Sequence, residues 1–204
     1  MKRIGAFLAV TSILSIVLSA CGADEPSPTS PSSNGSSSPT ATAPIPSTTP
    51  PQAAGTVSPW SSEPMEVNRS VAVPPVPELL AIRSAAHPNE GFDRITFDFR
   101  DTLPGYEVRY VSEVIADGSG QPVNVPGRQH LEIVFRPAQA HNDAGTAAVT
   151  PDSMSLDYPM MRAYAITGDF EAVLTVVVGL DDVVGYRVGE LPGQPGRIYV
   201  DVAA

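Results

Sequence analysis

Apolar and polar residues alternate with a period of two along much of the second half of the chain. Ile95, Phe97 and Phe99 alternate with polar residues in segment 94–100, and the same pattern recurs in segments 131–136 and 197–202. A period of two places apolar side chains on one face of a β-strand and polar side chains on the other. Each segment is therefore predicted to be a strand that buries one face.

Three further segments have strand character, namely GYEVRYV (105–111), MMRAYAITG (160–168) and FEAVLTVVVGL (170–180). Turn signals separate the strands: TLPG at 102–105, ADGSG at 116–120, TGD at 167–169 and PGQPG at 192–196. No window carries a capped stripe with the helical period. Seven or eight short strands between residues 78 and 204 predict an all-β domain, an antiparallel β-sandwich of two small sheets.

The strand predicted at 170–180 is apolar on both faces, through Leu174, Val176 and Val178 on one and Val173 and Val177 on the other. A sandwich core hides one face of a strand, so something else must cover the second. The candidates are the long segment 137–160, which has little strand character, the segment 64–77, or a partner. We expect the chain itself to provide the cover, although segment 137–160 could instead form a binding site.

The first 20 residues read as a secretory leader, with Lys2 and Arg3 before the apolar run GAFLAVTSILSIVL. Leu18-Ser19-Ala20-Cys21 resembles the lipoprotein box, in which the cysteine is acylated, for example with palmitate, and becomes the new N-terminus. Cys21 is the only cysteine, so the domain has no internal disulfide and must be held by its core. The alternative is an ordinary secreted protein in which the cysteine is incidental.

Residues 21–77 are predicted to be a lipidated N-terminus and a disordered tether, because the segment is rich in Pro, Ser and Thr and has little to bury. Trp60 within it is interpreted as a stray apolar side chain or a docking contact. The expected organisation is therefore a leader (1–20), a tether (21–77) and one domain (78–204). The expected location is the extracytoplasmic face of the cell membrane.

Charge excludes some partners. Without the leader the chain keeps ten arginines against 22 acids, a net charge of −12. Nucleic acid needs a basic stripe, which is absent from the sequence, and attraction to anionic lipid by charge is equally disfavoured. Any wall polymer is expected to be bound through neutral contacts that salt screens weakly.

The densest group of polar residues, in AHPNEGFDRITFDF (86–99), is interpreted as flanking a strand rather than as a catalytic site. Asp98 and Arg100 are expected to face Glu107 and Arg109 across a hairpin as ordinary solvated charges, and Asp93 and Arg94 are assigned to the same arrangement. The three histidines are not spaced as a metal pair, and no nucleophile motif is present. We therefore expect no metal, no cofactor and no enzyme activity.

The strings HPNEGFDRITFDF, LPGYEVRYV, DGSG, PAQAHND, GDFEAVLTVVVGL and RIYVDV occur in this order and together resemble the AMIN-like domain of actinobacterial secreted proteins and lipoproteins. The resemblance implies a non-catalytic envelope module, because the AMIN domains for which the family is named are β-sandwiches associated with peptidoglycan. The favoured ligand is therefore peptidoglycan or another wall polymer. A module that engages an envelope enzyme is the alternative, and a small hydrolase comes third.

The residues expected to contact the ligand are His87, Arg94 and His141. They are polar groups of the opening turn and of segment 137–160 that strand alternation does not already explain.

Overall fold

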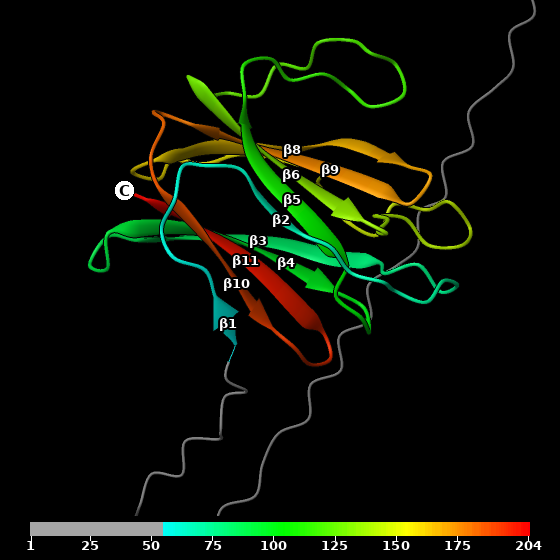
Figure 1. Cartoon of the computed structure of the whole chain (residues 1–204). Helices are drawn as coiled ribbons and strands as arrows, with labels where there is room; N and C mark the ends of the chain where they lie inside the picture. Colours follow the sequence, from blue (N-terminus) through cyan, green and yellow to red (C-terminus); the bar gives the residue numbers. More distant parts are fainter. Residues whose placement is uncertain (1–54) are drawn as a thin grey trace, which may run out of the picture. The chain divides into compact units, whose positions relative to one another are not determined.

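The computed structural model describes residues 55–204, which form two antiparallel β-sheets packed face to face (Figure 1). The five-stranded sheet contains, in spatial order, β1 (Thr56–Val57), β10 (Tyr186–Leu191), β11 (Gly196–Ala203), β4 (Phe92–Phe99) and β3 (Leu79–His87). The six-stranded sheet contains β2 (Met65–Val67), β5 (Gly105–Val111), β6 (Gln129–Arg136), β9 (Val173–Leu180), β8 (Met161–Phe170) and β7 (Ser153–Ser155). The predicted all-β sandwich is confirmed. Within residues 55–204 no helix could cross a membrane.

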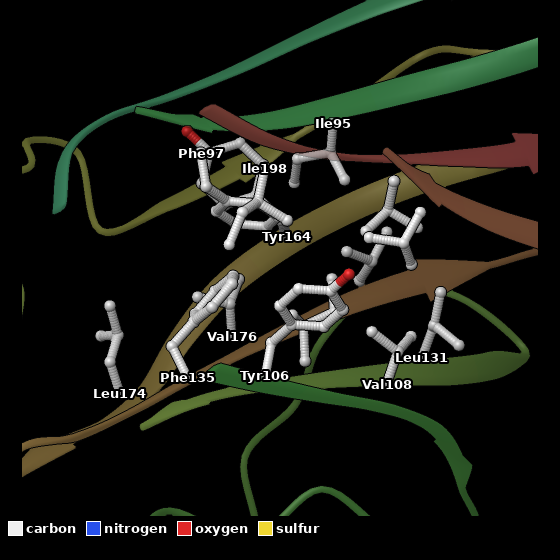
Figure 2. Close-up of a cluster of buried hydrophobic side chains, with 14 of the residues drawn as sticks. Ile95, Phe97, Tyr106, Val108, Leu131, Phe135, Tyr164, Leu174, Val176 and Ile198 are labelled. Atoms are coloured by element: carbon white, nitrogen blue, oxygen red, sulfur yellow. The ribbon is translucent and has the colours of Figure 1, made fainter. Parts of the chain in front are cut away.

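The core lies between the sheets and is built from the apolar halves of the alternating strands. Ile95 and Phe97 of β4 and Ile198 of β11 project towards side chains of β6 and β9, as Figure 2 shows. Phe135 packs edge-on against Phe97, with ring centroids 4.9 Å apart. Alternation therefore fixes which face of each strand is buried, and the polar residues between these positions point away from the core.

One predicted turn is wrong. We expected a turn at TGD (167–169), but β8 continues through these residues to Phe170, with a register irregularity between Ile166 and Gly168. The chain instead reverses at Glu171 and Ala172, whose φ angles are 50° and 60°. Two consecutive positive φ angles belong to a type I′ hairpin turn, which usually carries Asn-Gly. Glu-Ala gives no such signal, so the pattern placed the turn too early.

The second apolar face of β9 is covered by the chain itself, but not by either segment that the sequence suggested. Val177 is fully buried in a separate small cluster with Ala163 and Ala165 of β8 and with Val114 and Val125. The last two belong to the connection between β5 and β6, residues 112–128. This connection crosses β9 so closely that a side chain at Gly179 would overlap the carbonyl of Pro126. The outer face of β9 is therefore closed to a partner at Val177 and Gly179, whereas Val173 at the other end is only partly buried and lines a surface pocket.

Segment 137–160 extends the main core and the six-stranded sheet. Ala138, Ala140 and Val149 are buried in the main cluster, and β7 pairs with β8. The Asp93 carboxylate, which is fully buried, accepts hydrogen bonds from the backbone N–H groups of Met160 (2.7 Å) and Met161 (2.9 Å). Asp93 thus ties the end of this segment to β4 and has a structural role.

The sandwich begins upstream of the boundary that we predicted at residue 78. Strand β1 pairs with β10, and β2 pairs with β5. Two side-chain contacts reinforce this pairing: Arg69 forms an ion pair with Glu190 at 2.6 Å, and the Tyr186 hydroxyl lies 2.5 Å from the carbonyl of Glu63. Residues 56–67 are therefore part of the two sheets. The predicted leader, Cys21 and the tether up to residue 54 lie outside the described residues.

Candidate functional site

The outer face of the five-stranded sheet carries a concentration of arginine and aromatic side chains. Because Ile198, Val200 and Val202 point into the core, their neighbours on β11 point outwards, and the same argument applies to β3, β4 and β10. We call this surface the arginine face. Its members are Arg83, His87, Phe92, Arg94, Thr96, Asp98, Arg187, Arg197, Tyr199 and Asp201.

Asp201 lies at the centre of an ion network on this face. Its carboxylate is 0% exposed and accepts from Arg94 at 2.5 and 2.9 Å and from Arg187 at 2.8 Å. The two arginines remain 29% and 28% exposed. The hydrogen bond to Asp201 raises the pKa of Arg94, which therefore stays cationic. One buried acid thus holds two half-exposed cations in place.

Aromatic rings enclose the same two guanidinium groups. The Arg94 guanidinium lies 4.1 Å from the ring centroid of Tyr199, and that of Arg187 lies 4.5 Å from the ring of Trp60. The ring centroid of Phe92 lies 5.1 Å from the Arg94 guanidinium and 5.2 Å from the Arg187 guanidinium. Cation–π contacts of this geometry restrict the arginines further. Both guanidinium groups are therefore positioned before any ligand arrives.

The backbone of β10 makes room for the Tyr199 ring. Gly189 is the register partner of Tyr199, and a Cβ at this position would overlap the ring and its hydroxyl. The ring therefore lies flat over the neighbouring strand, beside Arg94. With the Gly189 backbone on one side and the Arg94 guanidinium over the ring, only 8% of Tyr199 is exposed.

The other two arginines differ in their partners. Arg83 of β3 forms a two-point ion pair with Asp98, at 2.6 and 2.9 Å, and this hydrogen bond raises its pKa. Arg197 is the register partner of Asp98, yet it forms no ion pair with any residue from 55 to 204. Its Nε atom is buried without a hydrogen-bond acceptor in the same range.

A pocket of about 690 Å³ opens on the arginine face. Its lining includes Arg83, Arg94, Arg197 and Tyr199, together with Tyr158 and Met154 from segment 137–160. The Tyr158 hydroxyl lies 3.2 Å from the Ser84 hydroxyl of edge strand β3. Segment 137–160 therefore contributes one wall of the pocket as well as part of the core.

The structure places two of the three predicted contact residues at this pocket. His87 and Arg94 both line it, and His87 stacks on Phe92 with centroids 4.6 Å apart. His141 is elsewhere: its Nδ1 lies 2.7 Å from the carboxylate of Asp169, and it does not line the pocket.

The charge pairing expected across a hairpin is wrong. Strands β4 and β5 belong to different sheets, so Asp98 cannot face Glu107. Asp98 binds Arg83 instead, and Glu107 binds Arg109 of its own strand and Arg136 of β6. Sequence reasoning also missed Arg83, Arg187, Arg197, Tyr199 and Trp60 as site residues. The outward positions of the terminal RIYVDV strand were visible in the alternation, but not which strands lie beside it.

The described part of the chain offers no group of three or more His, Cys, Asp or Glu side chains that could hold a metal. What the arginine face can do is bind: it combines fixed cations, aromatic surface and a concave shape, which are the features of a site for a polar ligand with apolar faces.

Comparison with known proteins gives one match. A family model described as the AMIN-like domain matches residues 77–204. Searches of curated proteins and of solved structures returned no match. The matched region contains the whole arginine face and begins next to the predicted boundary at 78, whereas β1, β2 and Trp60 precede it.

Proposed function

The chain belongs to the AMIN-like domain family, and from this membership we propose that it is a cell-envelope protein whose sandwich binds peptidoglycan or another wall polymer without cleaving it. Membership supports an envelope-associated module, because more than half of the chain is the domain itself. The polymer, the binding surface and the absence of cleavage are parts of the proposal.

The observation that carries the proposal is the pocket on the arginine face. Glycan rings present C–H surfaces edged by hydroxyl groups, and they suit a site with an aromatic platform and fixed hydrogen-bond donors. Tyr158, which is half-buried, supplies the accessible aromatic surface beside the buried Tyr199. Arg94, held by Asp201, supplies donors that need no reordering when a ligand binds. Little conformational entropy is then lost on binding.

We also propose that the mature protein is tethered to the membrane through acyl chains on Cys21. The lipoprotein box at 18–21 and the Pro/Ser/Thr-rich segment after it support this part. Two or more acyl chains give firm anchoring where one gives marginal binding. Cys21→Ala should release the processed protein from membranes or leave it unprocessed. Equal membrane retention after removal of the leader would contradict the anchor.

The alternative is a module that engages an envelope enzyme, and one of the two surfaces considered for this contact is largely covered. It was to use either the apolar strand or segment 137–160, and residues 112–128 cover that strand at Val177 and leave only Val173 partly exposed. Segment 137–160 is packed into the core through three buried residues and leaves Met154 partly exposed beside the pocket. The wall polymer is therefore favoured over a protein partner.

Sedimentation with purified cell walls tests the proposed function. The chain from residue 22 onward, without the leader and the acylated cysteine, should pellet with walls and stay in solution without them. Arg94→Ala should weaken the retention, and Arg109→Ala on the outer face of the six-stranded sheet is the matched control. Failure of the unaltered chain to pellet would overturn the proposal, and release of soluble wall fragments would show an enzyme.

A further inference from the structure

The arginine face has the opposite charge balance to the rest of the protein. Without the leader the chain has ten arginines and 22 acids, but four of these arginines and only two acids, Asp98 and Asp201, lie on this face. The strands of this face thus carry two surplus positive charges, and Glu90, which lies 3.4 Å from His87 in the turn after β3 and also acts on Arg94, offsets part of this surplus. Net charge alone favoured neutral contacts with a polymer, whereas the local distribution of charge favours an anion.

The surplus is located at Arg197 and in the Asp201 network. In the network two arginines share one carboxylate, which leaves one positive charge. Arg197 supplies the other, because both oxygens of its neighbour Asp98 are bound by Arg83. Its Nε is enclosed but has no acceptor among the described residues. The enclosed Nε is itself out of reach of a ligand, but Arg197 as a whole is only half-buried and lines the pocket, so a ligand would meet the rest of its guanidinium.

The neighbours of Arg197 define what could accept. Tyr199 lies two residues along β11 and therefore on the same side of the sheet, so the guanidinium and the aromatic ring lie side by side in the pocket lining. A group bound to Arg197 would have the Tyr199 ring next to it. That arrangement suits a sugar ring with an acidic substituent.

The arginines of this face already show the geometry that they favour. Arg83 binds Asp98 and Arg94 binds Asp201 with two donors on two oxygens each. This two-point contact matches a planar carboxylate to a planar guanidinium. Arg197 has the same chemistry and lacks the carboxylate.

We propose that the pocket recognises a carboxylate-bearing sugar of a wall glycan, with Arg197 binding the carboxylate and the half-buried Tyr158, beside Tyr199 in the lining, contacting the sugar ring. This inference deepens the proposed function and rests on it. It adds the class of ligand and assigns the specificity to a residue that lies outside the predicted contact set.

Titration calorimetry on residues 22–204 tests the class of ligand. The probes are a glucuronic acid oligosaccharide, an uncharged glucose oligosaccharide of the same length, and a glycerol phosphate polymer. The glucuronic acid probe should bind at least about tenfold more tightly than the uncharged one, and its affinity should fall as salt rises. Equal affinity for the uncharged probe, or tighter binding of the phosphate polymer, would overturn the proposal.

Variants then test the residues. Arg197→Met should reduce the affinity for glucuronic acid to that of the uncharged probe and leave the unfolding midpoint unchanged, because no ion pair is lost. Arg136→Met, on the other sheet, is the control and should bind normally. Gly189→Ala, which pushes the Tyr199 ring from its place, should weaken both sugar probes alike.

Wall sedimentation of the same variants separates the two proposals. If Arg197→Met pellets with walls and binds glucuronic acid as the unaltered chain does, the carboxylate proposal fails while wall binding stands. If the unaltered chain binds neither walls nor sugar, both fail.

Discussion

Replacing Asp201 by asparagine tests whether the arginine face is a rigid, preformed surface. The substitution keeps the size and one oxygen of the side chain but removes its negative charge. Arg94 and Arg187 would then face each other without the acid that joins them. Because Asp201 is fully buried, water cannot replace the lost charge at its position.

The expected loss of stability follows from the contacts. Asp201 accepts three hydrogen bonds from charged donors, each worth about 1.5–3 kcal/mol. Asparagine retains one acceptor, and both arginines are more than one quarter exposed and so regain hydration. We therefore expect a loss of about 2–4 kcal/mol, near the lower end of the range for breaking a buried ion pair.

Urea unfolding followed by circular dichroism measures this loss. With a slope of about 2 kcal/mol per molar urea, the midpoint of Asp201→Asn should fall by about 1–2 M. Asp181→Asn is the control, since Asp181, which pairs with Arg162, is 32% exposed where Asp201 is 0% exposed, and its midpoint should hardly move. Similar midpoints for the two variants would mean that the Asp201 network is an ordinary solvated cluster, and the argument for preformed donors would fail.

Three more outcomes follow from buried groups. Burial raises the pKa of Tyr186 to about 12, so near pH 10 the unfolded chain loses the hydroxyl proton while the folded chain keeps it. The free energy of unfolding should therefore fall as the pH rises from 10 to 12. Urea titrations of Tyr186→Phe over the same pH range should show a smaller fall. Val177→Asp places a charge beneath residues 112–128 and should lower the free energy of unfolding by at least about 3 kcal/mol and expose that segment to protease. The control Val183→Asp, at an exposed site, should have neither effect. Asp93→Ala removes the acceptor for two backbone N–H groups and should cost about 2–4 kcal/mol in the same unfolding assay; an unchanged midpoint would contradict its role in holding segment 137–160.

The period-two pattern predicted the long strands because the alternation of apolar and polar residues within each strand determines which face it buries. Segments 94–100, 131–136 and 197–202 each bury one face, and all three are strands of the sandwich. The short strands have too few residues to show such an alternation. Strand β1 has two residues and pairs with β10 more than 130 positions later, so its placement depends on the edge that β10 offers, and a local pattern cannot report that edge.

The cover of β9 was missed for a similar reason. The covering residues Val114, Val123 and Val125 are separated by turn and proline positions in residues 112–128, and they form no periodic stripe. The requirement for a cover was readable from the strand itself, whereas the identity of the cover depended on which connection crosses that face of the sheet.

The candidate site was predictable one strand at a time but not as a surface. Arg94 and the outward positions of β11 could each be assigned to a polar face. That Asp201 joins Arg94 to Arg187 depends on the spatial order β10-β11-β4, which brings together residues 107 positions apart. Charges that looked paired within a hairpin were therefore assigned to the wrong partners.

Trp60 shows that the segment before the family match contributes to the site. It lies 4.5 Å from the Arg187 guanidinium and 43% of it is exposed, while Ser58 accepts a hydrogen bond from the Val188 amide and fixes this segment on β10. Trp60 thus packs on the outer arginine of the Asp201 network, which favours keeping Arg187 on Asp201. A chain with the same residues 77–204 but a different upstream segment would keep Tyr199 and Arg94, yet its second arginine would lose the Trp60 contact and be held by Asp201 and Phe92 alone. The segment interpreted as a plain tether therefore helps to determine how rigid the binding surface is, and binding experiments need residues 55–76 as well as the matched domain.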